Sequence, residues 1–329
     1  MKAKSVLCTL AISGLLASAI LVHTAVDLIA EDTKTYRIGL SVWTGYPTSV
    51  QGFKDGLAAD GFVEGKNVEY FYKKSDGDAR VQRQMAVELS EAHLDLVYSL
   101  TTPGTSIVKD VLSESIPIVF SIVTYPADAG LIESFEYSGN NLVGTSNYVN
   151  LKHYITLLKT LLPNAKTIAI FHRKGEPNSK IQAANMIRLL KKAGFTVIDL
   201  EPTTVEEMRQ MAEEVADEVD VFMTTTDTLC QGGGEAELVI ISLQRGIPIL
   251  SSNKMGIEGG STFGPVVDFY SLGKMSAEMA VKILKNQANP SSLQSKLQEP
   301  PITLINGTSV AALGLDLPEA SLRTAQILK

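Results

Sequence analysis

The stretch LDLVYSL at residues 94–100 is followed by IPIVF at residues 116–120. Almost every position in both segments is apolar, which is typical of strands buried on both faces of a parallel sheet. The pattern returns as VDVFM at residues 219–223 and IPIL at residues 247–250. Proline is accepted at the start of the second segment of each pair, because the first residue of a strand needs no ladder N–H. The two pairs predict one buried parallel sheet in each half of the chain.

Two further features recur around these segments in the same order. RIGL at residues 37–40 opens the first half, and TIAI at residues 167–170 opens the second. Each is followed by a helical stretch that ends in a Gly-Phe step, at residues 61–62 and 194–195, where glycine can close a helix before the next strand begins. A repeat this long is not a solenoid period and favours two similar lobes.

Strand-like and helix-like segments alternate along both halves, which predicts βαβ units and parallel sheets. The expected fold class is therefore α/β, with two doubly wound, Rossmann-like lobes joined by a hinge. The expected strands are residues 36–42, 68–72, 95–100, 117–123, 142–146, 167–171, 196–200, 219–225, 248–251 and 260–265.

The order of these segments also suggests where each lobe begins and ends. We expect lobe 1 to comprise residues 36–148 with a returning helix near residues 269–285. Lobe 2 is expected to comprise residues 149–265 with the C-terminal segment near residues 298–329. Apolar residues at three- and four-residue spacing predict helices through Val81, Met85, Val87, Glu88 and Leu89, and through Ile181, Ala184, Ile187 and Leu190.

The N-terminus has the pattern of an export signal. Lys2 and Lys4 precede an apolar run over Val6–Val22, and a basic region followed by an apolar region is typical of a secretory signal. Residues 1–30 are therefore expected to be a signal peptide or, if they are not cleaved, a membrane anchor; the apolar run is at the short limit for a span of about 20 residues. Either alternative predicts a periplasmic or other extracytoplasmic location.

Composition and motifs argue against several classes of function. The formal net charge is −7 and no Lys/Arg-rich run is present, so we expect no binding to nucleic acid. Cys8 and Cys230 form no metal or redox motif, and the four histidines are scattered, so we expect no metal site and no cofactor. The serines lack the GxSxG pattern, and Gly232–Gly234 lacks the spacing of a phosphate-binding loop. We therefore expect no catalytic residues.

Ligands of open parallel sheets bind beyond the carboxyl ends of the strands. These ends are rich in hydroxyl and aromatic side chains, and hydroxyls together with helix N-terminal N–H groups suit a small anion such as a carboxylate. Trp43, Tyr46 and Tyr125 could supply apolar walls. The pattern predicts a pocket between two lobes that close on a small ligand. The expected strand ends are residues 42–47, 100–106, 121–126, 146–147, 172–179, 224–228 and 251–254.

Stretches along nearly all of residues 36–329 resemble the ABC transporter substrate-binding family, in its tryptophan-binding-protein-like form with the type I periplasmic-binding fold. The resemblance implies a receptor that closes on a small ligand, with amino acids among the ligands, and delivers it to a membrane permease with a cytoplasmic ATPase. We expect a monomer. The stretches are GFKDGL at 52–57, GFVEGKNV at 61–68, DLVY at 95–98, TP at 102–103, IPIVFS at 116–121, GL at 130–131, GNNLVG at 139–144, LLPNAK at 161–166, TD at 226–227, IPIL at 247–250, DFYSLG at 268–273 and LGL at 313–315.

By matching position, the resemblance assigns the pocket to ten polar or aromatic residues: Thr102, Thr124, Tyr125, Ser146, Asn147, Asn178, Ser179, Thr226, Asp227 and Asn253. With Trp43, Tyr46 and Thr105 from the strand ends, they complete the set of thirteen expected ligand-binding residues.

Two departures from the family pattern bear on the ligand. The loop after Pro47 is about three residues shorter, and Asn253-Lys254 replaces an acid after Ser252. An ammonium group would then have Asp227 as its main charged partner, so a carboxylate without an amine competes with an amino acid, with Lys254 as its counter-charge.

Two other functions fit the same sequence pattern. The first is a sensor, in which the capture module stays anchored in the membrane and presents its ligand-bound form to a signalling partner. The second is an enzyme on a similar fold, for which Asp227, His172 and Cys230 are the candidate groups in the cleft.

Overall fold

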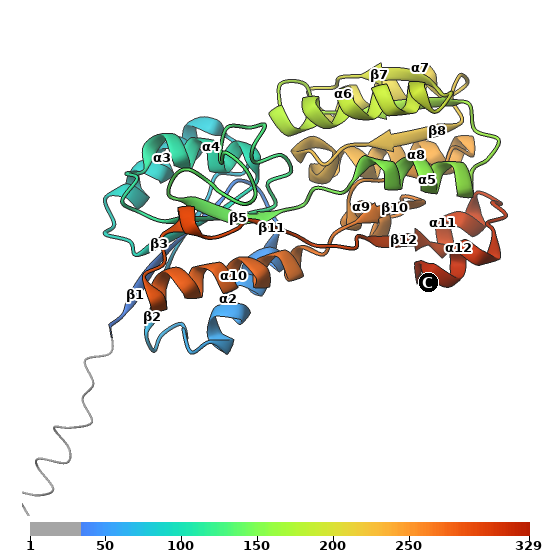
Figure 1. Cartoon of the computed structure of the whole chain (residues 1–329). Coiled ribbons are helices and arrows are strands. Elements are labelled where there is room, and N and C mark those ends of the chain that lie inside the picture. Colours follow the sequence, from blue (N-terminus) through green and yellow to red (C-terminus); the bar gives the residue numbers. More distant parts are fainter. Residues whose placement is uncertain (1–33) are drawn as a thin grey trace, which may run out of the picture.

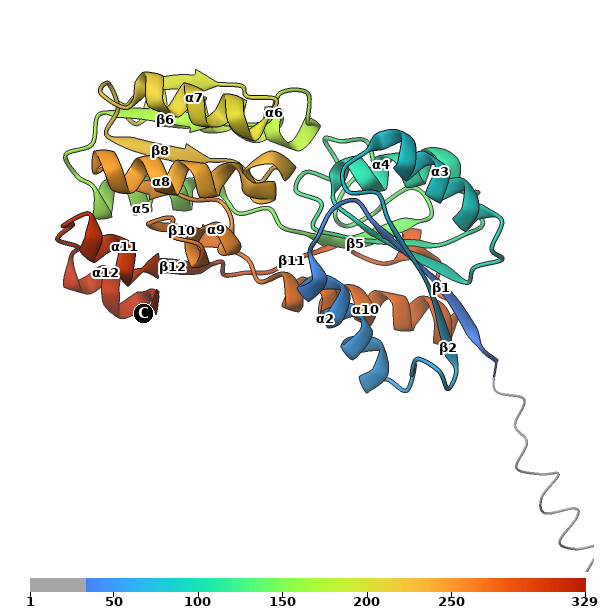
Figure 2. The ribbon, with the colours of Figure 1, turned by 180° about the vertical axis from the view of Figure 1, so that it is seen from behind.

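The computed structural model describes residues 34–329, which form two α/β lobes side by side (Figures 1 and 2). Lobe 1 is built on a six-stranded sheet and lobe 2 on a seven-stranded sheet. The fold is therefore the expected α/β architecture of the type I periplasmic-binding class. The predicted signal or anchor at residues 1–30 lies outside the described residues. No helix in residues 34–329 is long and apolar enough to cross a membrane.

The lobe 1 sheet is parallel throughout. Alternate residues of its strands face two different helical layers. Ile38 and Tyr98 face one layer, and Val97 and Phe120 face the other, which explains why these strands are apolar at successive positions. The strand order is β11 (Lys296–Leu297), β5 (Leu142–Ser146), β4 (Ile118–Ser121), β3 (Leu96–Leu100), β1 (Tyr36–Val42) and β2 (Val68–Lys74).

Four helices cover the lobe 1 sheet. α3 (Ala79–Ser90) and α4 (Thr102–Val111) lie on one face, and α2 (Pro47–Ala59) and α10 (Phe269–Asn286) lie on the other (Figure 1). A short 3-10 turn, η2 (Pro290–Ser292), follows α10. α2 and α10 approach closely because both carry glycine at the contact: a Cβ on Gly52 would lie 2.1 Å from the carbonyl oxygen of Tyr270. Phe53 of α2 then stacks on Tyr98 of the sheet at a ring distance of 3.9 Å.

The lobe 2 sheet repeats this plan with one reversal, because β10 and β12 run antiparallel while the other pairs are parallel. The sequence patterns did not predict its edge strand β13 and the neighbouring β12, nor β11 of lobe 1. The order is β13 (Gln326–Leu328), β12 (Ile302–Asn306), β10 (Phe263–Val266), β9 (Ile249–Leu250), β8 (Val221–Thr224), β6 (Thr167–Phe171) and β7 (Thr196–Leu200).

The lobe 2 helices are also divided between the two faces of their sheet. α5 (Leu151–Leu161) and α6 (Pro177–Lys192) pack on one face, and α7 (Val205–Val215) and α8 (Glu235–Arg245) pack on the other. A π-helical turn, η1 (Cys230–Gly234), leads into α8. The short helices are α9 (Lys254–Glu258), α11 (Gly307–Ala312) and α12 (Glu319–Thr324).

The helices α3 and α6 bury faces that differ from those predicted. α3 buries Gln82, Ala86 and Leu89, whereas Val81 and Val87 are exposed. The predicted face was therefore wrong at both valines, because Gln82 is held inside by its hydrogen bond to Ser41 Oγ (2.7 Å).

In α6 the buried side chains are Gln182, Ala183, Met186 and Leu190, while Ala184 is exposed. The predicted residue Leu190 is buried, and the rest of the face is displaced by about one position. The cause is again an inward glutamine, because Gln182 accepts hydrogen bonds from Thr226 at the end of the neighbouring strand β8.

The polypeptide passes between the lobes three times: between β5 and α5, between β10 and α10, and between β11 and β12. In both lobes the carboxyl ends of the central strands lead toward the boundary between the two sheets (Figure 2). The segments that follow these strands therefore meet there.

Candidate functional site

A small cavity lies where the two lobes meet. Its volume is about 10 Å³, room for about one water molecule. Lobe 1 and the segment that leaves it contribute Tyr46, Thr101, Thr102, Ile122 and Asn147. Lobe 2 contributes Glu176, Asn178, Thr226, Asp227, Thr228 and Gln231.

A larger groove of about 840 Å³ lies at the opposite end of the lobe 1 sheet, beside Tyr36, Pro117 and Gln287. This groove lies at the amino-terminal ends of β1 and β4. Ligands of doubly wound sheets bind at the carboxyl ends, so the smaller cavity is the better candidate site.

Three residues of the cavity wall have strained backbone conformations. Tyr46, Thr101 and Ile122 have φ values of 62°, 70° and 57°, in the region that favours glycine. Each follows or lies close to a strand end of lobe 1. Only three other non-glycine residues of the described chain share this feature. Such strain tends to concentrate at functional sites, where the surrounding structure holds it in place.

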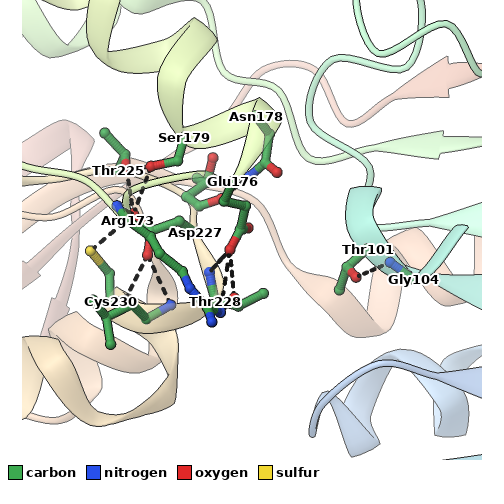
Figure 3. A network of polar contacts seen from close by, with 12 residues as sticks. Thr101, Gly104, Arg173, Glu176, Asn178, Ser179, Thr225, Asp227, Thr228 and Cys230 are labelled. Carbon is green, nitrogen blue, oxygen red and sulfur yellow. Dashed lines mark hydrogen bonds and ion pairs between the residues drawn. The ribbon is translucent and has the colours of Figure 1, made fainter. Parts of the chain in front are cut away.

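Asp227 is the centre of a hydrogen-bond network at the lobe 2 wall (Figure 3). Its Oδ1 accepts from the backbone N–H groups of Leu229 (2.9 Å) and Cys230 (2.7 Å). Its Oδ2 accepts from the Arg173 N–H, the Ser179 and Thr225 hydroxyls and the Cys230 thiol, at 2.6–3.3 Å. The carboxylate is 1% exposed, and the network ties β6, α6 and the segment after β8 together.

Glu176 is the second acid of the cavity wall. It immediately precedes Pro177, the first residue of α6, and it is 6% exposed. Thr228 donates to its carboxyl group from the backbone N–H (3.2 Å) and from the hydroxyl (2.5 Å), and Arg173 Nη1 lies 3.7 Å from Oε2. Burial, and next the negative charge of Asp227, raise the pKa of Glu176 above its usual value. Two carboxyl groups in one buried wall suit a ligand that carries a positive charge.

Four buried polar atoms of residues that line this cavity lack a hydrogen-bond partner in residues 34–329: Asn178 Oδ1, Asn147 Oδ1, Thr102 Oγ1 and Gln231 Oε1. Asn178 is fixed in orientation, because its Nδ2 donates to the carbonyl oxygen of Thr226 (2.7 Å). Buried polar atoms are nearly always paired in folded proteins, so these four are available to a ligand.

The N-terminus of α4 forms part of the lobe 1 wall. Thr101 caps this helix, and its Oγ1 accepts from the Gly104 N–H (3.4 Å; Figure 3). A helix N-terminus favours a negative group such as a carboxylate. The cavity therefore joins a site for an anion in lobe 1 to a site for a cation in lobe 2.

The structure divides the thirteen sequence-predicted site residues into two groups. Six of them line the cavity: Tyr46, Thr102, Asn147, Asn178, Thr226 and Asp227. The other seven, which do not line it, are Trp43, Thr105, Thr124, Tyr125, Ser146, Ser179 and Asn253.

Several of these seven hold other parts of the site in place. Ser146 Oγ donates to the Thr124 carbonyl oxygen (2.9 Å), and Ser179 donates to Asp227. The Thr105 hydroxyl is paired with Ser99 inside lobe 1 (2.9 Å).

The two aromatic side chains of this group are packed inside the protein. Trp43 lies against α4, so close that a Cβ on Gly104 would be 2.9 Å from the Trp43 Cβ. Tyr125 packs edge-to-face on Tyr148 at a ring distance of 5.5 Å. Both side chains have an unpartnered polar atom in the described chain, Trp43 Nε1 and the Tyr125 hydroxyl.

Asn253 and Lys254 have partners away from the cavity. The Asn253 side chain donates to Glu235 and caps α9 by accepting from the Gly256 N–H (2.8 Å). Lys254 pairs with Asp268 (2.7 Å). Lys254 is therefore not free to act as the counter-charge of a carboxylate ligand.

Five residues of the cavity wall were not among the thirteen predicted, although all but the last lie within the predicted strand ends: Thr101, Ile122, Glu176, Thr228 and Gln231. Glu176 carries the most chemistry among them. The signal that could have found it is its place directly before a proline that starts a helix, at the end of a strand.

The three candidate catalytic groups named from the sequence are Asp227, whose hydrogen bonds are given above, His172 and Cys230. His172 Nε2 lies 2.8 Å from Asp199 Oδ1, and His172 does not line the cavity. Burial raises the pKa of the Cys230 thiol well above its ordinary value, which disfavours a reactive thiolate. In residues 34–329 no cluster of three or more His, Cys, Asp or Glu side chains could hold a metal ion.

Two doubly wound lobes that bring their strand ends to one polar cavity define a ligand-binding protein of the periplasmic-binding class. The chain belongs to the ABC transporter substrate-binding protein family, whose model matches residues 44–329.

Individual relatives agree with this assignment. A tyrosine-binding protein from Clostridioides difficile (strain R20291) is 28% identical over 291 residues, which cover 87% of this chain and 83% of that protein. A Streptococcus ABC domain solved in complex with L-Trp superimposes with a TM-score of 0.84 and 26% identity, over 90% of this chain and 100% of the other. A ligand-free, open substrate-binding protein with adhesive properties from Clostridium difficile gives a TM-score of 0.71 at 26% identity, over 90% and 99% of the two chains.

Proposed function

We propose that this protein captures an α-amino acid with an aromatic side chain between its lobes and delivers it to a membrane permease driven by a cytoplasmic ATPase. The observation that carries the proposal is the pairing of unlike groups across one cavity. The N-terminus of α4 suits a carboxylate, and Glu176 with Asp227 suits an ammonium group. An α-amino acid carries both groups on a single carbon atom.

The same wall argues against the competing ligand, a carboxylate without an amine. Such a ligand would leave the acids of lobe 2 without a cationic partner, and Lys254, its expected counter-charge, is paired with Asp268. It would also bring a negative charge toward Glu176 and Asp227. Tyr46, which lines the cavity, supplies aromatic surface for an aromatic side chain. The named relatives, which bind tyrosine and L-Trp, support the same ligand class.

We infer that the ligand enters by separation of the lobes. A cavity of about 10 Å³ admits no amino acid, so the lobes must part around the three connecting segments. The higher TM-score with the L-Trp complex than with the open, ligand-free relative supports the view that the present arrangement is the closed one.

We propose that the protein works outside the cytoplasm as a monomeric binding component without catalytic activity. The family assignment supports export and a permease partner. The saturated Asp227 and the buried Cys230 support a role in binding, since neither is available as a base or nucleophile. A membrane-anchored sensor would use the same capture site and differ in the partner that reads it.

Thermal unfolding of residues 31–329 with a panel of amino acids, small carboxylates, nucleosides and sugars tests the proposal. A ligand at 100 times its dissociation constant stabilises the folded state by about 2.7 kcal/mol. That corresponds to a rise of several degrees in Tm, at about 2–4 °C per kcal/mol. We expect the largest rise with tyrosine, tryptophan or phenylalanine and no product in the mixture. A rise confined to sugars or nucleosides would refute the proposed ligand class.

A further inference from the structure

We propose that the side chain of Glu176, and not that of Asp227, contacts the ammonium group of the ligand. Asp227 instead holds the loops of the cavity wall in position. This inference rests on the proposed capture of an amino acid. It assigns the recognition of the amine to a residue that the sequence patterns did not single out.

Asp227 has little capacity left for a ligand. Its two oxygens already accept six hydrogen bonds, two on Oδ1 and four on Oδ2. A carboxylate offers about four lone-pair sites, so an additional ammonium would have to displace an existing donor. Three of these donors are backbone N–H groups, of Arg173, Leu229 and Cys230, and their loss would disturb the loops after β6 and β8. The bonds make Asp227 an anchor of these loops.

Glu176 has both the place and the free acceptor capacity. All its short hydrogen bonds come from one residue, Thr228, which adjoins Asp227 in the chain. Its carboxyl group lines the cavity, and the unpartnered Oδ1 of Asn178 lines the same wall two residues further along. Asn147 Oδ1, also unpartnered in the described chain, faces the cavity from the segment that leaves lobe 1. An ammonium group has three donors and would satisfy these three acceptors.

The charges around Glu176 fit the same assignment. The charged and titratable groups that face it are Asp227, Arg173 and the hydroxyl of Tyr46. With both acids ionised, the two carboxylates and the one guanidinium leave one negative charge, which a ligand ammonium neutralises. Burial and the charge of Asp227 favour the protonated form of Glu176, and a bound ammonium favours its ionised form. Ligand binding at mildly acidic pH should therefore release a proton from Glu176.

Isothermal titration calorimetry of the purified protein tests this assignment with matched ligands. The probes are L-tyrosine and L-tryptophan, and their amine-free counterparts 3-(4-hydroxyphenyl)propionate and indole-3-propionate. The variants are Glu176→Gln and, as the control, Glu214→Gln on the exposed face of α7. We expect E176Q to weaken binding of the amino acids by about 10- to 100-fold, the usual range for a lost charged hydrogen bond. Binding of the amine-free acids should be unchanged or stronger, and E214Q should match the wild type.

Proton release on binding provides a second measurement. Titrations in buffers with different ionisation enthalpies should reveal proton release on binding an amino acid at pH 5–6, and the release should be absent in E176Q. The assignment is overturned if E176Q weakens the binding of both ligand classes equally, or if E176Q binds the amino acids with wild-type affinity and unchanged proton release. Either result leaves the proposed capture of amino acids intact. If the wild type binds none of the amino acids, the proposed function and this inference both fail.

Discussion

The hydroxyl groups of Thr124 and Thr226 lie 3.3 Å apart, one at the end of a lobe 1 strand and one at the end of a lobe 2 strand. This hydrogen bond joins the lobes beside the cavity. Thr226 is fixed within lobe 2, because its N–H (2.8 Å) and its hydroxyl (2.6 Å) both donate hydrogen bonds to Gln182 Oε1. The pair is therefore an inter-lobe contact that depends on the relative position of the lobes.

Thr124→Val should shift the protein toward the open arrangement. The variant keeps the shape of the side chain and removes one inter-lobe hydrogen bond, worth about 1 kcal/mol. We expect ligand affinity to fall by about 3- to 10-fold, mainly through faster dissociation, as measured by stopped-flow fluorescence of Trp43. The control is Thr160→Val, whose exposed hydroxyl bonds only within α5. Equal dissociation rates for T124V and the wild type would show that the bond does not hold the lobes closed.

Asp227→Asn should reduce stability strongly. The substitution removes the charge from a buried hub that accepts six hydrogen bonds, and it places an amide NH₂ among donors. We expect a loss of about 2–4 kcal/mol in the free energy of unfolding, measured by urea denaturation. Asp217→Asn is the control, because its ion pair with Arg245 is exposed and such pairs contribute about 0–1 kcal/mol. A loss in D227N no greater than in D217N would exclude the anchoring role.

Glu235 should make stability depend on pH. It is buried at the start of α8, where it accepts hydrogen bonds from Ser261, Asn253 and Thr224. Burial raises its pKa from 4.5 to about 7. The folded state therefore keeps a proton that the unfolded chain loses near pH 4.5, so the stabilisation present below pH 4.5 disappears as the pH rises to about 7.

The variant Glu235→Gln isolates this contribution. Between pH 5 and 7, we expect its free energy of unfolding to fall less steeply than that of the wild type. Over the full shift in the pKa of Glu235, the two falls should differ by up to about 3 kcal/mol. Urea denaturation at pH 5, 6, 7 and 8 measures the two curves. Glu176 adds a slope of the same sign in both proteins, so the difference between the curves reports Glu235. Parallel curves would mean that Glu235 is ionised throughout this range.

Gly52→Ala should separate α2 from α10. The added Cβ would lie 2.1 Å from the Tyr270 carbonyl oxygen, a distance that forces the helix backbones apart. We expect a loss of about 3 kcal/mol in the free energy of unfolding, at the upper end for overpacking. Gly45→Ala is the control, because nothing lies within 4 Å of its Cβ position. Similar stability of the two variants would contradict the tight contact between these helices.

The positions of the strands could be predicted from the sequence because burial on both faces leaves continuous apolar runs. The predicted strands at residues 36–42, 142–146, 167–171 and 196–200 have the observed bounds. The strands β11, β12 and β13 were not predicted. The edge strands β11 and β13 consist of two and three residues and carry no such pattern. The internal strand β12 is buried on both faces, and its apolar residues Ile302, Leu304 and Ile305 carry a pattern that the prediction did not use.

The site could be predicted only as far as its neighbourhood. Of the six predicted residues that line the cavity, Tyr46 came from the strand ends and the other five from the family resemblance. Whether a side chain lines the cavity or supports it depends on partners that are distant in the sequence. Ser179 is turned toward Asp227 across 48 positions of the chain, and Asn253 is engaged by Glu235. The role of Glu176 depends in the same way on Thr228, from a different loop.

Calorimetric titration of the wild-type protein with L-tyrosine and L-tryptophan, after unfolding and refolding to remove any ligand retained from expression, tests capture most directly. The proposed function predicts saturable binding of at least one of them, with one site per chain and a radius of gyration that falls on binding in small-angle scattering. Absence of binding heat with both, with no compaction and no rise in Tm for any amino acid, would contradict the proposal that the cavity between the lobes is an amino-acid site.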